Sequence, residues 1–231
     1  MSDRRRPVVP AQLNFLAHRD ELTRLPLAER FDQIARINLW GCASSRSGLG
    51  SELAATGRLR AALPSFLARH NVRSLLDVPC GDFGWLSRVD LSIPYTGADI
   101  VPSLVEENER RYGERPTGRR FLKLDLTKDA LPRADLVLCR DGLVHLSFAN
   151  IGRAIDNIRA SGARYLLTTT FLDHEVNRDI EDGDWRMLNL EREPFNLPPP
   201  IDVLIEGCTE GDGAYTDKAL GLWECWVRDG R

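Results

Sequence analysis

Short apolar runs alternate with longer amphipathic segments along most of the chain. The apolar runs have the length and composition of buried strands, and they cover residues 72–78, 95–100, 121–124, 135–139 and 164–171. Helix signals lie between them. Pro102 suits the first turn of a helix that Gly113 ends, and Ser147 suits the N-cap of a helix that Gly162 ends. The alternation predicts an α/β, Rossmann-like fold with a mostly parallel sheet and helices on both faces.

The C-terminal part has a different pattern. Residues 172–200 have weak periodicity and end in three consecutive prolines. Two further strands are predicted over 201–206 and 220–227, joined by the segment TEGDGAYTD. Because that segment is too short for a helical crossover, these two strands must run antiparallel to each other. We therefore expect the parallel strands to be closed by an antiparallel C-terminal pair.

The N-terminal residues are predicted to be helical, over 11–23, 28–38 and 51–70, with a Gly- and Ser-rich segment at 40–51. Pro64 is expected to kink or split the third helix, and a further short helix is predicted over 84–89. We expect residues 1–70 to form a helical extension, or lid, on a core at 71–231 whose substrate loop is 172–200.

The composition is that of an ordinary globular protein, because 42% of the 231 residues are hydrophobic and 28% are charged. The net charge of −3 suits neither nucleic acid nor an anionic membrane as a partner. The five cysteines are scattered without a C-x-x-C pair, which favours reduced thiols. No signal peptide is recognisable, and the apolar runs are far shorter than the roughly 20 residues that span a bilayer. We expect a cytoplasmic protein, monomeric or homodimeric.

Acidic residues and a glycine turn follow the predicted strands, where open α/β sheets bind their ligands. The first strand continues as LLDVPCGDFGWL at 75–86, with Asp77 at its end and Gly81 in a turn that lets the backbone approach a ligand. Asp99, Asp125 and Asp141 accompany the next three strands. A dinucleotide-dependent dehydrogenase would need a G-x-G-x-x-G turn, which is absent, so we set that class aside.

These motifs, taken in order, resemble those of the class I S-adenosylmethionine-dependent methyltransferases. The matching segments are DVPCG at 77–81, GADI at 97–100, LDL at 124–126 and CRDG at 139–142. The resemblance extends from about residue 72 to the C-terminus. It implies the cofactor S-adenosyl-L-methionine.

The resemblance also implies roles for individual residues. Gly81 would lie against the methionine part of the cofactor, Asp99 would accept bonds from the ribose hydroxyls, and Asp125 would accept one from the adenine amino group. Asp77 would orient the glycine turn or the cofactor's ammonium group. The alternative is that these acids only cap helices and loops. The remaining cofactor contacts expected are Pro79, Cys80, Asp82, Trp85, Ile100, Leu126, Arg140, Trp40, Ser51 and Arg60.

The chain departs from the family pattern at Phe83, which stands where a second glycine is usual, with Gly84 one place later. The turn is therefore expected to be altered. Asp82 would then contact the cofactor, line the pocket mouth or serve as a helix N-cap.

Methyl transfer to an alcohol requires the acceptor to be aligned and its proton to be removed. His145 lies four residues after Asp141, so both side chains would face the same way on a helical segment. We predict Asp141 and His145 as the catalytic pair, the alternative being that His145 packs on the sheet. His18 and His70 fall in helical segments and are expected to be packed or solvated.

The segment after the fifth strand supplies the candidates for acceptor binding. Its aromatic and hydrogen-bonding side chains suit a polyhydroxyl ligand such as a sugar, and they equally suit loop packing. Asp173 and His174 would also suit a general base or, with Asp141, a divalent cation site, but the spacing does not require a metal and none is predicted. The candidates are Asp173, His174, Asn177, Trp185 and Arg186.

The function expected from these observations is O-methylation of a hydroxyl on a small molecule, a sugar or a glycan. Two alternatives stay open, namely N-methylation of a small metabolite and a non-catalytic binding protein that retains the fold. Nucleic-acid substrates are not expected, since the sequence has no basic face with interleaved aromatic residues.

Overall fold

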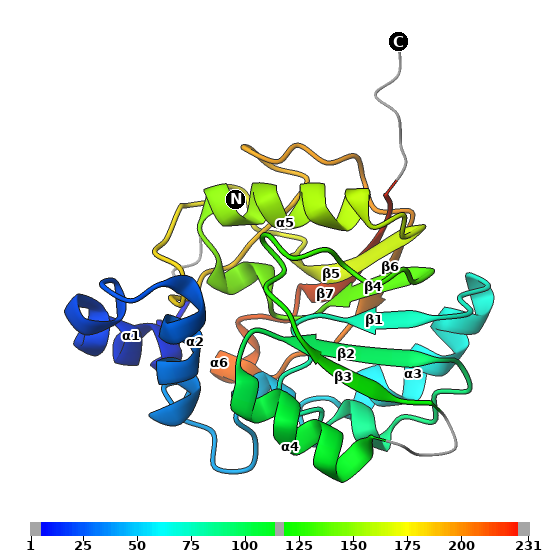
Figure 1. Ribbon diagram of the computed structural model, residues 1–231. Helices are drawn as coiled ribbons and strands as arrows, with labels where there is room; N and C mark the ends of the chain where they lie inside the picture. The colour runs from blue at the N-terminus through cyan, green and yellow to red at the C-terminus, as the bar shows by residue number, and fades with distance from the viewer. Residues whose placement is uncertain (1–5, 114–117, 226–231) are drawn as a thin grey trace.

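The computed structural model describes residues 6–113 and 118–225, and its centre is a seven-stranded sheet in the order β3-β2-β1-β4-β5-β7-β6 (Figure 1). The strands are β1 (Leu75–Asp77), β2 (Tyr95–Asp99), β3 (Arg120–Lys123), β4 (Leu136–Cys139), β5 (Tyr165–Phe171), β6 (Asp202–Ile205) and β7 (Lys218–Glu224). The helices are α1 (Pro10–Leu22), α2 (Leu27–Arg36), α3 (Gly57–Arg69), α4 (Pro102–Tyr112), α5 (Phe148–Ala160) and the short α6 (Glu210–Gly213).

The first five strands are parallel, and β7 pairs antiparallel with both β5 and β6. The predicted antiparallel C-terminal pair is therefore confirmed. Its connection, expected to be a plain loop, contains α6. The predicted last strand extended to residue 227, of which 226 and 227 lie outside the described residues.

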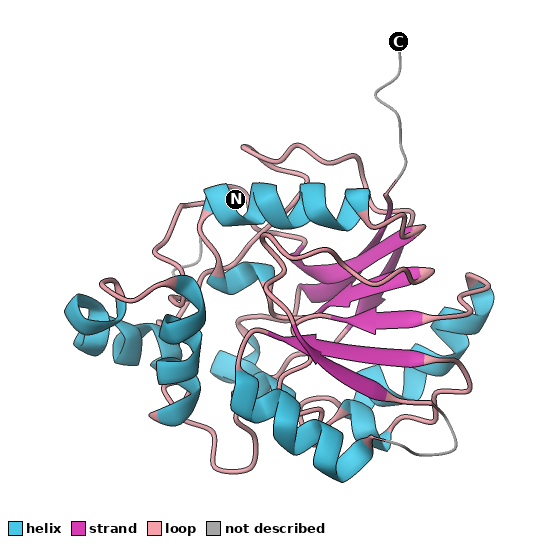
Figure 2. Ribbon diagram, in the orientation of Figure 1, coloured by secondary structure: helices cyan, strands magenta, loops and turns pink. Residues whose placement is uncertain are grey.

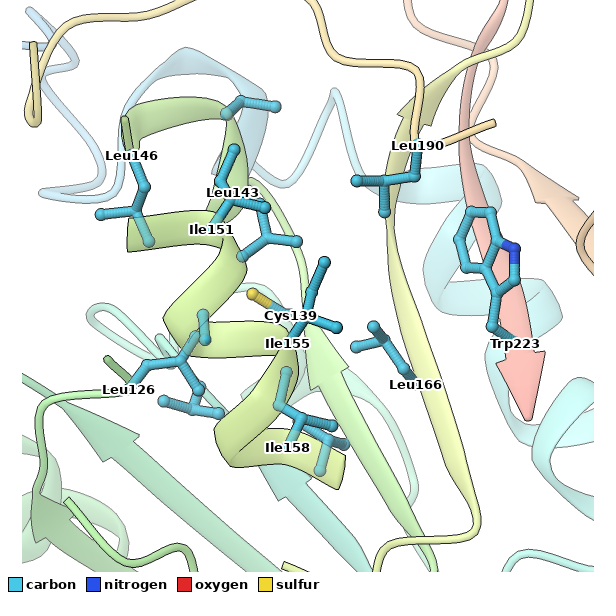
Figure 3. Close-up of a cluster of buried hydrophobic side chains, with 14 of the residues drawn as sticks. Leu126, Cys139, Leu143, Leu146, Ile151, Ile155, Ile158, Leu166, Leu190 and Trp223 are labelled. Carbon is cyan, nitrogen blue, oxygen red and sulfur yellow. The ribbon is translucent and has the colours of Figure 1, made fainter. Parts of the chain in front are cut away.

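Both faces of the sheet are covered, because successive strand residues point to opposite sides. Leu76 belongs to the core beneath α5, and Leu75 to the core beneath α3 and α4. The α5 core packs Ile151, Ile155 and Ile158 against the sheet (Figure 3). Figure 2 shows α5 on one side of the sheet and α3 and α4 on the other. This is the layered arrangement that the alternating pattern predicted.

Local signals decided most of the helix ends. Helix α4 spans the predicted residues, with Pro102 in its first turn, and the Ser147 hydroxyl caps α5 by accepting a bond from the Asn150 N–H at 3.4 Å. Two predicted helices are shorter than expected. The segment 84–89 forms only a 3-10 turn over Leu86–Arg88, and the helix predicted from residue 51 begins at Gly57.

Helices α1 and α2 lie beside the sheet and share a small core of their own that includes Phe15, Leu22 and Ile34 (Figure 1). Helix α3 instead shares a core with the sheet, through side chains such as Leu63 and Phe66. The division of the chain at residue 70 stays a prediction. Among the described residues, no helix has the length and apolar character needed to cross a membrane.

Candidate functional site

A cavity, called here the larger cavity, opens at the carboxyl ends of β1, β2 and β4. The residues that follow these strands form one wall of the cavity. Residues of the N-terminal region, between Leu27 and Ser51, also line it. Its lining includes Asp77, Pro79, Cys80, Gly81 and Trp85; Asp99, Ile100 and Leu104; Asp125 and Leu126; Arg140, Asp141 and His145; and Leu27, Phe31, Trp40, Ser47 and Ser51. Almost all of the residues predicted to hold a cofactor thus meet in one place.

The turn after β1 is held from three sides. Gly81 has φ of +53°, and its N–H donates to Asp99 Oδ2 at 2.9 Å. The buried Asn108 on α4 donates to the Gly81 carbonyl at 2.7 Å. A Cβ on Gly81 would overlap the hydroxyl of Ser47, so only glycine fits the close approach between this turn and the 40–51 segment.

Phe83 does not obstruct the turn. Its backbone has φ of +55°, the left-handed conformation that a glycine would adopt, and its side chain is fully buried away from the cavity lining. The ring centroid lies 4.8 Å from that of Tyr95 and 5.2 Å from that of Phe121. The strain of this backbone conformation is therefore offset by the packing of the Phe83 ring in the core.

Asp82 has a role that the sequence did not indicate. Its carboxylate accepts bonds from the Ser45 hydroxyl at 2.8 Å and the Arg46 N–H at 2.9 Å, and it also accepts from the Gly84 N–H at 3.0 Å. It is absent from the lining of the larger cavity, and Trp85 occupies the N-cap of the following 3-10 turn. Asp82 ties the 40–51 segment to the glycine turn.

Two carboxyl groups in the larger cavity are buried without a cation in hydrogen-bond contact among the described residues. Burial raises the pKa of Asp77 to about 7, although the Tyr95 hydroxyl donates to it at 2.7 Å. Burial likewise raises the pKa of Asp99 to about 6, against the bonds from the Gly81 and Val101 N–H groups. A ligand that offers a positive charge or hydroxyl donors would stabilise both carboxylates.

The lining of the larger cavity also includes a third carboxylate, Asp125, and apolar side chains. Asp125 accepts from the N–H of Thr127 at 2.9 Å and lies 3.3 Å from the Lys128 ammonium. Ile100, Leu104 and Leu126 line the cavity beside it. Such a slot suits a flat ring with a polar edge.

A smaller cavity adjoins the larger one, and four residues line both: Trp40, Ser47, Asp141 and His145. The rings of Phe171, Trp185 and Tyr215 line the smaller cavity and meet edge to face, with centroids 5.7 to 6.1 Å apart. Val9, Pro10 and Ala11 close one side. The segment that carries them is attached by the Arg6–Asp217 ion pair at 2.6 Å and by the bond from the Tyr215 hydroxyl to the Pro7 carbonyl.

Four charged side chains meet between the two cavities. Lys218 Nζ lies 2.7 Å from Asp141 Oδ2 and 3.7 Å from Glu206, while Arg140 lies 2.7 Å from Glu206 and 3.3 Å from Asp141. Burial alone would raise the pKa of Asp141, but the two cations outweigh it and hold that pKa well below its usual range. Asp141 is therefore an anchored anion rather than a proton acceptor.

His145 lies on a 3-10 turn over Leu143–His145 and lines both cavities. Its Nδ1 is 2.8 Å from the Asp184 carbonyl. Since a carbonyl only accepts, Nδ1 carries the hydrogen and Nε2 carries the lone pair of the neutral ring. Burial lowers the pKa of His145 to about 4, so the ring is neutral at pH 7. The Trp40 ring lies against it, with centroids 4.9 Å apart.

The segment 172–200 positions this histidine. Arg186 is buried and donates to the carbonyls of Leu143 and Leu146 at 2.9 and 2.8 Å, on either side of His145. The Gly183 N–H donates to the His145 carbonyl at 2.7 Å. Burial lowers the pKa of Arg186 to about 10. Arg186, predicted to bind the acceptor, instead supports the turn that carries His145.

Of the other four residues predicted to bind the acceptor, one lines a cavity and three do not. Trp185 lines the smaller cavity, whereas Asp173, His174 and Asn177 do not. Asn177 donates to the carbonyls of Asn189 and Glu193 and holds the segment together, and the Asp173 N–H donates to Asp217. Arg60, predicted for the cofactor, bonds to the Leu53 carbonyl outside both cavities. Within the described residues, no group of three metal-ligating side chains occurs.

Sequence reasoning missed the charged residues at the C-terminal strands. Glu206 follows β6, Lys218 begins β7, and Glu210 lies between them at the smaller cavity. The sequence has charged residues at both ends of β6 and β7, but it does not distinguish the buried Glu206 and Lys218 from the exposed Glu224. Glu206, Glu210 and Lys218 come close together because β6 pairs with β7, and the local sequence does not reveal that pairing.

No protein-family model matches the chain, and no curated protein matches it. Among solved structures, an S-adenosylmethionine-dependent methyltransferase from Clostridium acetobutylicum matches with a TM-score of 0.54 and 11% identity, over 73% of this chain and 91% of that one. The N-methyltransferase NodS from Bradyrhizobium japonicum, in complex with S-adenosylhomocysteine, matches with a TM-score of 0.50 and 15% identity, over 62% and 74%.

A third match is partial. It is an amino pentose methyltransferase from Micromonospora echinaspora, 24% identical with a TM-score of 0.41, and the match covers 48% of each chain. This chain thus spans about half the length of that enzyme, and the match carries no argument about the acceptor.

Proposed function

Since the chain has the fold of the class I S-adenosylmethionine-dependent methyltransferases, we propose that it is such an enzyme. We further propose that it methylates a hydroxyl group of a small molecule, a sugar or a glycan. The proposal rests mainly on the two adjoining cavities, which share the lining residues Trp40, Ser47, Asp141 and His145. A methyl donor in the larger cavity and an acceptor in the smaller one would meet at these residues, as direct methyl transfer requires.

The residues of the larger cavity fit S-adenosylmethionine, which supplies a methyl group bound to a sulfonium sulfur. Asp77 and Asp99 are buried acids with raised pKa values, and an ammonium group and a pair of ribose hydroxyls would stabilise their charged forms. Asp125, with Ile100 and Leu126, offers an acceptor and apolar walls to an adenine ring. The glycine turn leaves room for the backbone to approach the ligand.

His145 is proposed as the general base. In its neutral form Nε2 can accept the proton that a hydroxyl loses as its oxygen is methylated. The Asp184 carbonyl fixes the ring and its tautomer through Nδ1. The anchored carboxylate of Asp141 lowers the energy of the imidazolium that results, since Asp141 acts to raise the pKa of His145.

Calorimetric titration with S-adenosylmethionine and S-adenosylhomocysteine tests the proposal. We expect micromolar binding that Asp99→Ala abolishes, because this change removes the acceptor of the Gly81 and Val101 N–H bonds as well as that of the ribose. Asp90→Ala, at an exposed aspartate outside both cavities, is the matched control and should bind normally. Circular dichroism establishes that each variant is folded. Absence of heat with both ligands from a folded wild-type protein would refute the proposal.

A further inference from the structure

The charged side chains at and beside the smaller cavity carry one more negative than positive charge. Between the cavities, the cations Arg140 and Lys218 are balanced by Asp141 and Glu206 at 2.7 to 3.7 Å. Glu210 is the remaining charged group in the smaller cavity, and no described cation forms an ion pair with it.

The carboxylate of Glu210 lies close to the site where both cavities meet. A Cβ built on Gly50 would be 3.2 Å from Glu210 Oε1, 3.4 Å from Asp141 Oδ2 and 3.4 Å from Lys218 Nζ. The charged atoms of Glu210, Asp141 and Lys218 therefore all lie beside Gly50. Arg6 lies 5.8 Å from the centroid of the Tyr215 ring, but it forms an ion pair with Asp217 at 2.6 Å and also interacts with Asp173, so it adds no free positive charge.

The remaining walls of the smaller cavity are aromatic. Trp40, Phe171, Trp185 and Tyr215 all line it, and ring faces attract cations. A partly enclosed carboxylate beside such rings favours a protonated amine and repels a phosphate or a carboxylate.

We propose that the acceptor is a small hydroxyl compound that also has a protonated amine, and that Glu210 binds the ammonium group while His145 receives the hydroxyl proton. The inference rests on the proposed function, since it names the substrate class of the same site. The reaction is balanced within the site: the hydroxyl oxygen forms the new bond to the methyl carbon, the carbon–sulfur bond of the donor breaks, and the proton moves to Nε2 of His145.

The test uses two series of hydroxyl compounds, each with a cationic, a neutral and an anionic member. One series is glucosamine, glucose and glucuronate, and the other is tyramine, tyrosol and 4-hydroxyphenylacetate. Binding of each compound is measured by saturation-transfer NMR on the full chain with saturating S-adenosylhomocysteine. We expect an amine to bind about tenfold more tightly than the acid of its series, which is the size of one charged hydrogen bond.

Glu210→Gln should remove most of that tenfold advantage while leaving the neutral compounds unchanged. Glu175→Gln, which removes the same charge from an exposed position outside both cavities, is the matched control and should preserve the preference. The inference is overturned if the acids bind as tightly as the amines, if neither amine binds, or if Glu210→Gln leaves the preference intact. The wild-type comparison alone decides the first two outcomes, whatever the stability of the variant. Lack of S-adenosylhomocysteine binding in the calorimeter would instead refute the proposed function.

Discussion

Under the proposed function, the raised pKa of Asp77 makes the affinity for S-adenosylmethionine and S-adenosylhomocysteine dependent on pH. Burial raises this pKa to about 7, and Asp77 lines the larger cavity, where the proposed function pairs it with the ammonium group of the ligand. Only the carboxylate form attracts an ammonium group. As the pH falls below 7 the free protein takes up a proton that binding must expel, so affinity must fall with falling pH.

The magnitude follows from the titration curve. Between pH 7.0 and 5.5 the fraction of ionised Asp77 falls from about one half to about one thirtieth, so the dissociation constant should rise about 15-fold from this group. The α-ammonium of the ligand stays protonated over this range. Binding at pH 5.5 should release close to one proton from Asp77, which calorimetry in two buffers of different ionisation enthalpy measures.

Asp77→Asn is the matched variant. An asparagine oxygen can still accept the bond from the Tyr95 hydroxyl at 2.7 Å, while the titrating charge is lost. The variant should bind S-adenosylhomocysteine weakly at pH 7.0, with a pH dependence about 15-fold smaller than that of the wild type. The remaining dependence comes from Asp99, whose pKa is about 6. Equal wild-type affinity at the two pH values, without proton release, would show that no ammonium group contacts Asp77.

Further predictions concern catalysis and stability. His145→Ala should lower turnover by about 10²- to 10⁴-fold with little change in the S-adenosylhomocysteine dissociation constant, as stopped assays and calorimetry would show; a loss of stability with unchanged turnover would assign His145 to packing instead. Arg186→Met should also lower turnover, because it releases the carbonyls on both sides of His145, and a normal rate in a folded variant would contradict its positioning role. Lys218→Met removes one of the two cations that Asp141 and Glu206 share and leaves Arg140 alone to balance both buried carboxylates, so it should lower the free energy of unfolding by about 3–5 kcal/mol in urea titrations. Phe83→Ala should lower it by a similar amount, about 3–5 kcal/mol, while cofactor affinity per folded molecule stays normal, since the ring is in the core and outside the cavity.

Local chemistry made much of the fold predictable. Proline and glycine bound α4 in the sequence as they do in the structure, and Ser147 caps α5 as expected. The site at the strand ends was also predictable, because the carboxyl ends of parallel strands lie at one edge of the sheet. Asp77, Asp99 and Asp125, read from three separate segments, accordingly line a single cavity.

The segments without a repeating pattern were not predictable in the same way. Residues 172–200 hold the His145 turn mainly through bonds to backbone carbonyls, and a backbone group has no signature in the sequence. From the sequence, Asp82 was expected at the cofactor, at the pocket mouth or at a helix N-cap, and Phe83 was expected to alter the turn. In the structure Asp82 ties down the 40–51 segment and Phe83 fills the core. Each role depends on which distant segment arrives beside the residue.

By itself, the sequence determined the layered α/β architecture and the acids at the strand ends, because hydrophobic periodicity and the restraints on proline and glycine act over a few residues. Only the tertiary structure decided which charged side chains meet at and beside the smaller cavity. Asp141, Glu206, Glu210 and Lys218 come from three parts of the chain and meet because β7 inserts antiparallel between β5 and β6. Charges in a buried site are stable only when their partners arrive with them, and the partners were set by strand pairing over long sequence distances.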